Sequence, residues 1–172
     1  MNSLDSVAIL GRVKRLSDEL KQANPPPEET TQSYGQLVIY MSLVTGTRGY
    51  IEKIVHQING SYESGWYDAC AVMIRRLIET LIIEAFETHK ISSQIKNSSD
   101  DFLYLKDLIN ATLAEKSWNL GRNAKKSLQS IKDIGDRSAH SRRFVAHRRD
   151  IDKVMDDLRI VVQELIYLAN LK

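Results

Sequence analysis

The sequence has few of the residues that support disulfides, chain bends or membrane spans. Among its 172 residues there is one cysteine, Cys70, and its only prolines are three in a row, Pro25 to Pro27. A single cysteine excludes an internal disulfide and leaves no second thiol for a zinc cluster. Because Cys70 lies among apolar residues, we expect a small buried hydrophobe rather than a nucleophile. No apolar run approaches the roughly 20 residues that a membrane-spanning helix needs.

Common catalytic and targeting motifs are also missing. There is no glycine-rich phosphate loop, no HExxH and no GxSxG, and His56 and His89 stand alone on predicted helices. We therefore expect no metal and no cofactor. The first residues, MNSLDSVAIL, lack the basic and long apolar segments of a signal peptide, so we expect a cytoplasmic protein without membrane contact.

Charge is distributed unevenly along the chain. The formal net charge is only +2, but residues 121–149 hold nine Lys or Arg and two Asp. The remainder holds 15 basic and 20 acidic residues. The basic character is therefore concentrated in one segment, as in proteins that contact polyanions.

Apolar residues recur at helical spacing, and no stretch alternates for long enough to make a strand. The pattern predicts an all-α protein, an up-down helical bundle of four to five helices plus an N-terminal helix. We expect residues 1–24 to form an N-terminal helix or arm, 25–34 a Pro-rich linker and 35–172 the bundle. Helices are predicted over residues 4–23, 36–58, 65–89 and 98–115, then to His140, and from Asp150 onward.

Details of these helices can be predicted as well. Two adjacent apolar rows over 65–89 predict a helix at the centre of the bundle. The dipeptide Asn59-Gly60 is typical of a helix end, and the spacing of Ser98 and Asp101 of a helix start. Gly46 and Gly49 indicate either a bend or the close approach of another helix. At the N-terminus, Ser3 is a plausible cap.

A polar cluster is expected between two of the helices. Arg75 and Glu79 lie one turn apart and form at least a weak surface pair. Arg76 lies nearer the apolar side of the same helix and should seek a carboxylate. We predict that Arg76 contacts Asp136, fixes the two helices together and so orients His140.

The segment DIGDRSAHSRRFVAHRRD, residues 133–150, holds five arginines and two histidines. Metal-independent RNA cleavage needs a base and fixed cations. His140 or His147 has the right chemistry for the base, and Arg137, Arg142 or Arg143 for the cation. The alternative is structural, because cations such as Lys132, Arg137 and His140 offset the negative end of a helix dipole.

The same segment also suits binding without cleavage. Arg148 and Arg149 are expected just before the last helix, where cations are mildly disfavoured, and such a local conflict often marks function. Together with Arg142 and Arg143 they offer forked donors to phosphates. Phe144 adds a stacking face for an unpaired base.

Two stretches together resemble a known family. GWYDACAVMIRRLIETLIIEAFE, residues 65–87, precedes IKDIGDRSAHSRR, residues 131–143, by some fifty residues. This pair is similar to a prokaryotic domain family of uncharacterised function related to the HEPN superfamily. The residues that carry the resemblance are Arg75, Arg76, Leu77 and Glu79 in the first stretch and Gly135, Asp136, Ala139 and His140 in the second.

The resemblance covers about residues 60–171 and implies a four- or five-helix bundle that often dimerises. It also implies an association with nucleic-acid-handling and defence systems. Active HEPN proteins are metal-independent RNases that use an Arg separated by four to six residues from a following His. At the expected place before His140 this chain has Asp133, Ile134 and Gly135, whereas Arg142 and His147 match the spacing outside the helix end.

Three functions therefore remain open. The first is a nucleic-acid-associated module that contacts RNA or DNA through residues 137–149, as a homodimer, in a bacterial defence or toxin-antitoxin-like setting. The second is a divergent metal-independent HEPN-type endoribonuclease. The third is a non-enzymatic dimerisation or protein-interaction domain.

Overall fold

A computed structural model of the chain describes residues 11–16, 19 and 37–172. The chain divides into two units, Met1–Thr30 and Thr31–Lys172. In the first unit the described residues are helical, and Val13 and Leu16 are exposed. Part of the predicted N-terminal helix is thus present.

The Ser3 cap and the ends of that predicted helix lie outside the described residues. The same is true of the Pro-rich linker over 25–34.

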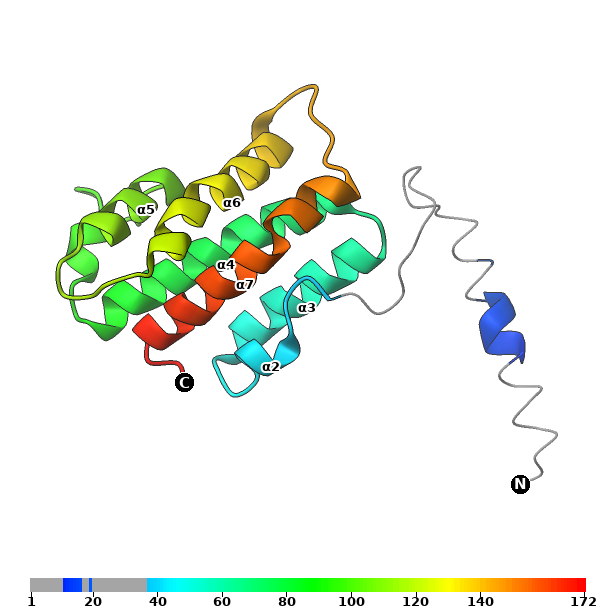
Figure 1. Cartoon of the computed structure of the whole chain (residues 1–172), viewed down its shortest axis with the longest axis horizontal. Coiled ribbons are helices and arrows are strands. Elements are labelled where there is room, and N and C mark those ends of the chain that lie inside the picture. Colours follow the sequence, from blue (N-terminus) through cyan, green and yellow to red (C-terminus); the bar gives the residue numbers. More distant parts are fainter. Residues whose placement is uncertain (1–10, 17–18, 20–36) are drawn as a thin grey trace. The chain divides into compact units, whose positions relative to one another are not determined.

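The second unit is built from helices joined by short connections (Figure 1). In chain order these are α2 (Met41–Val44), α3 (Gly49–Glu63), α4 (Tyr67–Thr88), the 3₁₀ helix η1 (Ser92–Ile95), α5 (Leu105–Ala114), α6 (Arg122–His140) and α7 (Arg148–Leu168). In the part of the chain that the structure describes there is no strand, only an isolated bridge between Lys96 and Phe102. The prediction of an all-α helical bundle is confirmed.

Helix α4 lies at the centre of the bundle. It packs against α3, α5, α6, α7 and η1. One of its apolar rows is completely buried, namely Cys70, Ile74, Ile78, Ile82 and Phe86. Since a helix covered on several sides needs a wide apolar surface, the central position predicted for this segment is confirmed.

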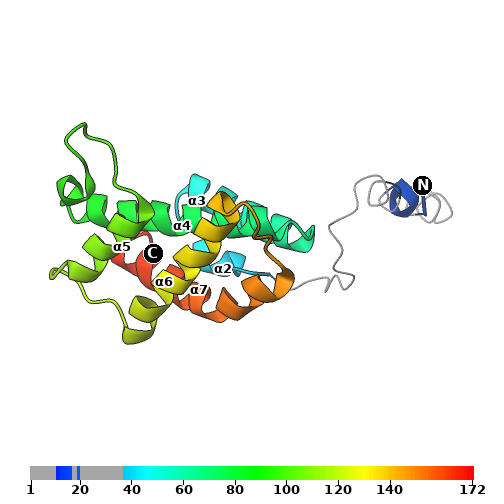
Figure 2. The ribbon, with the colours of Figure 1, turned by 90° about the horizontal axis from the view of Figure 1, so that it is seen from above.

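Helix α5 and the basic segment lie toward opposite ends of the bundle. Figures 1 and 2 show α5 at one end, and the loop that joins α6 to α7 near the opposite end. The turn between α3 and α4 lies near the start of α7, and contacts between these segments confirm this neighbourhood. The basic segment is therefore placed at one end of the bundle, beside the start of α4.

The single helix predicted over 36–58 is wrong. The chain makes the short α2, turns at Gly46, which has a φ of +86°, and enters α3 at Gly49. A left-handed residue interrupts a helix, and glycine adopts that conformation without steric cost. Of the two interpretations of the glycines, a change of direction is the one observed.

Helix α3 also continues through the dipeptide Asn59-Gly60, where we predicted its end. The Asn59 side chain accepts a hydrogen bond from the Ile39 backbone N–H at 3.0 Å and donates one to the Ile39 carbonyl at 2.8 Å. Asn59 is buried by this pairing. Its role is to attach the segment before α2 to the bundle, not to stop a helix.

Two other helix boundaries differ from the prediction. The helix start expected at Ser98 is wrong, because Asn97 Oδ1 accepts the backbone N–H groups of Ser99 and Asp101 and closes a turn, and α5 begins only at Leu105. Helix α7 begins at Arg148, two residues before Asp150. The predicted end of the preceding helix at His140 is confirmed.

Within the described ranges we find no helix whose length and apolar character would allow it to cross a membrane.

Candidate functional site

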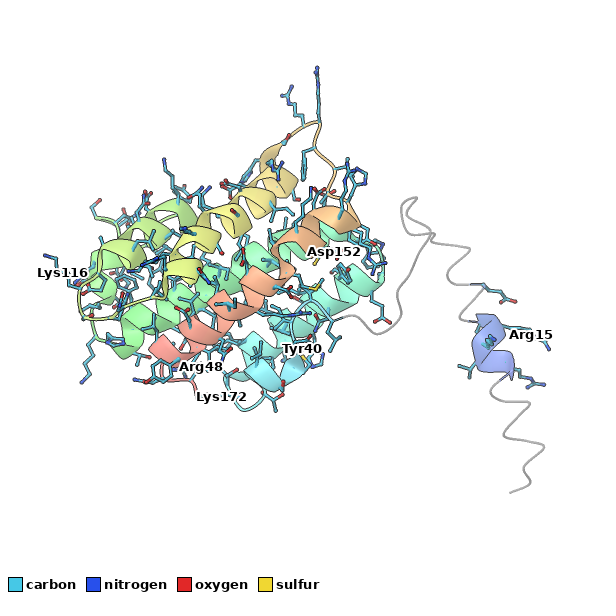
Figure 3. All side chains as sticks on the ribbon, viewed as in Figure 1. Arg15, Tyr40, Arg48, Lys116, Asp152 and Lys172 are labelled. Atoms are coloured by element: carbon cyan, nitrogen blue, oxygen red, sulfur yellow. The ribbon has the colours of Figure 1, made fainter. Side chains whose placement is uncertain are left out.

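The loop of residues 141–147 carries the centre of the basic segment. Helix α6 ends at His140, and its last turn is closed by a hydrogen bond from the Ser141 N–H to the Arg137 carbonyl. The chain then crosses to α7. Figure 3 shows side chains that project away from the bundle along this loop.

Three contacts attach the loop to the bundle. The Ala146 N–H donates to Asp68 Oδ1 on α4 at 3.0 Å, and Ala146 is buried. Phe144 packs against the edge of the core. The Arg137 guanidinium lies over the Phe144 ring, 4.5 Å from its centroid, in a cation–π contact. The loop therefore has a fixed base.

The predicted stacking face of Phe144 is thus occupied on one side by Arg137 and backed by the core. A planar guanidinium can itself stack on a base. Arg137 is exposed, so the outer surface of this pair is presented by the guanidinium and not by the ring.

His147 is the N-cap of α7. Its backbone N–H donates to Asp150 Oδ2 at 3.0 Å, and the two residues form a reciprocal capping box. This arrangement satisfies backbone donors at the helix start that would otherwise have no partner. His147 thus has a structural task that accounts for its position.

Arg148 is engaged by groups of its own chain. Its Nε donates to the Tyr62 hydroxyl at 3.0 Å and lies 3.7 Å from Asp152 Oδ2. The Tyr62 hydroxyl in turn donates to Asp152, which Figure 3 labels near the start of α7. Burial and the hydrogen bond to Asp152 raise the pKa of Tyr62 to about 12. Arg148 is therefore part of the contact between α3 and α7.

The remaining cations of the segment face solvent. Arg142, Arg143 and Arg149 are exposed, and His140 is exposed at the last position of α6. Among the residues that the structure describes, these three arginines have no carboxylate within ion-pair distance. The arginines at positions 48, 75, 148 and 159, in contrast, all have one.

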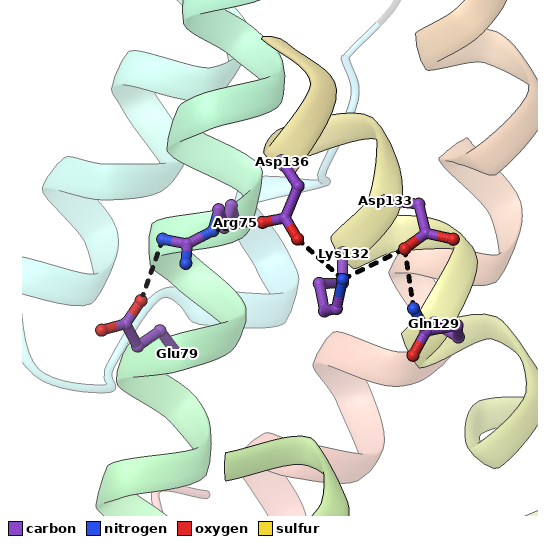
Figure 4. Close-up of polar contacts among 6 residues, drawn as sticks. All are labelled: Arg75, Glu79, Gln129, Lys132, Asp133 and Asp136. Atoms are coloured by element: carbon purple, nitrogen blue, oxygen red, sulfur yellow. Dashed lines mark hydrogen bonds and ion pairs between the residues drawn. The ribbon is translucent and has the colours of Figure 1, made fainter. Parts of the chain in front are cut away.

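The polar cluster between α4 and α6 exists, but with a different arginine from the one predicted. Arg75, not Arg76, donates to Asp136 Oδ1 at 2.9 Å, and Arg75 also reaches Glu79 at 3.4 Å (Figure 4). Arg76 is exposed. The predicted contact of Arg76 is wrong because the side of α4 that faces α6 is one residue, or about 100°, away.

Lys132 completes this cluster from within α6. Its Nζ contacts Asp136 Oδ2 at 2.7 Å and Asp133 Oδ1 at 3.1 Å, and only 9% of its side chain is exposed (Figure 4). The hydrogen bond to Asp136 raises the pKa of Lys132 in spite of burial. Burial opposes the charged form of Asp136, but hydrogen bonds from Lys132 and Arg75 lower its pKa overall. Both groups are therefore charged near neutral pH.

Gly135 explains how α6 comes so close to α4. A Cβ atom at this position would lie 2.6 Å from Arg75 Cβ and 3.1 Å from the Ala71 carbonyl oxygen. Only glycine allows this approach, which brings Asp136 within reach of Arg75. Among the described residues no hydrogen bond or ion pair joins His140 to this cluster, and its orientation by the cluster stays a prediction.

A hollow of about 600 Å³ lies between α6 and α7, next to the basic segment. It is lined by Ser130, Asp133, Ile134, Asp136, Arg137, Asp150, Lys153 and Val154. No local sequence pattern predicted this hollow, because its lining residues come from two different helices, α6 and α7. Asp68 and Tyr62 were missed as well, because their partners Ala146 and Arg148 are 78 and 86 residues away in the chain.

Other candidate sites in the bundle have fewer charged or reactive side chains. A groove of about 850 Å³ between α2, α7 and residues 117–120 is mostly lined by apolar and uncharged side chains. Burial raises the pKa of the Cys70 thiol to about 12, in agreement with a hydrophobic role. Among the described residues no three side chains of the metal-binding types gather at one point.

The fold and site define a helical-bundle domain with exposed arginines at one end. A family model described as a domain of unknown function (DUF4145) matches residues 56–172, a range that includes both sequence stretches quoted above. The chain belongs to this family. We found no curated protein and no solved structure that matches it.

Proposed function

We propose that this domain binds RNA or DNA through a basic surface formed by Arg142, Arg143 and Arg149. The observation that carries the proposal is the difference between these arginines and those of the rest of the bundle. Arg48, Arg75, Arg148 and Arg159 are held by carboxylates, whereas these three are exposed and have no ion pair in the described part of the chain. Arg76 and Arg122 are also exposed without an ion pair among the described residues, but each stands apart from the stretch 142–149, on α4 and at the start of α6.

The three unpaired arginines favour an anionic ligand, because placing like charges close together costs electrostatic free energy. Like charges in one short segment of the chain repel one another, and no carboxylate of the described bundle forms an ion pair with these three arginines. A phosphate can form such a pair, because a guanidinium presents forked donors that fit its oxygens. The attachment of the loop by Asp68 and Phe144 holds the arginines before a ligand arrives, which lowers the ordering cost of binding.

We expected Arg148 to contact phosphate, but in this proposal it has a structural role. Its contacts with Tyr62 and Asp152 make it a support of the surface. Arg137 contributes a stacking plane next to the phosphate-binding arginines. The relation to the HEPN superfamily, the homodimer and the defence setting belong to the same proposal and rest on the sequence resemblance.

Binding is favoured over cleavage by the state of the two histidines. His147 caps α7, which restricts its use as a base. His140 is exposed, and within the described residues it has no recorded side-chain partner that would orient it. An RNase would be detected by incubating labelled RNA with protein in EDTA, with His140→Ala as the comparison.

The proposal is tested by gel retardation of RNA and DNA over a range of salt concentrations. We expect retardation at low salt and a log-log salt slope of about two, since each phosphate contact on a single strand contributes about 0.7. The variant Arg142→Ala/Arg143→Ala/Arg149→Ala should bind weakly and with almost no slope.

The matched control removes three exposed cations elsewhere. Lys53→Ala/Lys106→Ala/Arg122→Ala changes net charge equally on α3, α5 and α6. It should retain most of the binding. Equal loss in both triple variants would mean nonspecific attraction by net charge, and no retardation of any nucleic acid by the unmodified protein would overturn the proposal.

A further inference from the structure

The lining of the hollow between α6 and α7 suits a nucleobase better than a phosphate. Carboxylates of Asp133, Asp136 and Asp150 line the hollow together with the cations Arg137 and Lys153, so opposite charges nearly balance and the lining gives a phosphate no net attraction. Its apolar walls come from Ile134, which is buried, and the half-buried Val154. A ligand of this hollow therefore needs both an apolar face and polar hydrogen-bonding groups, and a nucleobase has apolar faces and a polar edge.

We propose that this hollow accepts one unpaired base that carries an exocyclic amino group, so that the ligand of the basic surface is single-stranded. The inference rests on the proposed function. It adds which form of nucleic acid is bound and which bases are preferred.

Asp133 is the group that selects the amino base. Its Oδ1 accepts hydrogen bonds from Gln129 and Lys132, and no hydrogen bond to its other oxygen is recorded within the described residues. Its side chain is 52% exposed. Both Asp136 oxygens accept from cations, and the half-buried Asp150 is held by the α7 cap through its Oδ2. Asp133 therefore has an acceptor to offer.

Arg137 connects the hollow to the basic surface. Its guanidinium lines the hollow and lies over the Phe144 ring at 4.5 Å. A base that enters the hollow has this guanidinium beside it, while its phosphates continue toward Arg142 and Arg143 along the chain. In a duplex the base faces are stacked and the pairing edges are used, so extrusion would cost a few kcal/mol. A single strand avoids that cost.

The base preference follows from donor and acceptor positions. Cytosine and adenine present an amino N–H donor to a carboxylate acceptor, whereas uracil and thymine present a carbonyl oxygen at the equivalent place. Cytosine gains a charge-assisted hydrogen bond to Asp133, whereas uracil places a carbonyl oxygen against the same carboxylate. This difference should favour cytosine over uracil by about tenfold.

The test is fluorescence anisotropy with labelled single-stranded cytosine and uracil homopolymers of equal length, and with a duplex. Asp133→Asn should lower the cytosine preference to about twofold or less, because an amide offers both a donor and an acceptor. Asp107→Asn, an equal charge change at an exposed position of α5, should leave the preference unchanged. Val154→Phe, which fills the hollow, should weaken single-strand binding about tenfold and leave duplex binding unchanged.

The outcomes separate the two proposals. If the protein binds no nucleic acid at low salt, the proposed function fails and this inference fails with it. If it binds cytosine and uracil strands equally, and Asp133→Asn has no effect on either, the inference alone is overturned. Asp133→Asn keeps the acceptor that Gln129 and Lys132 use, so it decides the question even if Val154→Phe does not fold.

Discussion

Asp136 shows at the scale of one residue how the α4–α6 contact depends on charge. It accepts from Arg75 at 2.9 Å and from Lys132 at 2.7 Å. Replacement by asparagine removes the charge that Arg75 and Lys132 share and leaves them with the more distant Glu79 and Asp133, at 3.4 and 3.1 Å. We expect Asp136→Asn to lower the free energy of unfolding by about 1 to 2 kcal/mol at neutral pH, less than for a fully buried pair because Asp136 is partly exposed. Urea denaturation measures this difference.

The same pair sets a pH dependence whose sign can be stated. Because the pKa of Asp136 is lowered in the folded state, its stabilisation is present above the unfolded value of about 3.9 and is lost as pH falls through the folded pKa. Because the pKa of Lys132 is raised, its stabilisation is present below about 10.4 and is lost as pH rises through the folded pKa.

The difference between the wild type and Asp136→Asn should therefore shrink as the solution is acidified below about pH 4. Glu79→Gln is the control, since the ion pair of Glu79 among the described residues is the longer 3.4 Å contact with the same arginine, and its loss should cost less than about 0.5 kcal/mol. A difference that stays constant down to acid pH would show that the charge of Asp136 is not what stabilises the contact.

Two glycines make a matched test at the scale of helices. Gly135→Ala would bring a Cβ within 2.6 Å of Arg75 Cβ, so α4 and α6 must separate. We expect a net loss of about 1 to 2 kcal/mol, although alanine favours the helix by up to about 1 kcal/mol. Gly60→Ala on α3 meets nothing within 4 Å and should stabilise by about 0.5 to 1 kcal/mol. Thermal or urea denaturation of both variants measures the two changes in the free energy of unfolding. Equal stabilisation by the two substitutions would contradict the close packing of α4 and α6 at Gly135.

The same elements show what could be predicted from the sequence. The wide apolar surface of α4 was recognisable because periodicity depends only on local sequence. The end of α3 was not, because the Asn59 side chain bonds to Ile39, 20 residues away in the chain. The choice between Arg75 and Arg76 depends on how α4 is rotated against α6, which Gly135 permits. The hollow depends on that rotation as well, so no local pattern predicted it.

At the scale of the bundle, charges divide into those that hold it together and those that face outward. Arg75 and Arg148 join neighbouring helices through a carboxylate or a tyrosine, and Lys132 holds the shared Asp136 from within α6. Arg142, Arg143 and Arg149 join nothing in the described structure. The basic segment recognised in the sequence is therefore partly structural, and its net charge alone overstates the number of groups that a ligand can contact.

Cys70 provides a test of whether the bundle unfolds as one unit. The thiol is completely buried on α4, the helix that contacts α3, α5, α6 and α7, and burial raises its pKa to about 12. At pH 8 a disulfide reagent such as DTNB should react very slowly with the folded protein, because the thiolate is scarce and inaccessible. Reaction should accelerate in urea along the same curve as the loss of helical circular dichroism, since α4 is exposed only when its neighbours separate. Rapid reaction without urea, or labelling well before the helices are lost, would mean that α4 becomes accessible by a local opening and that the bundle is not cooperative.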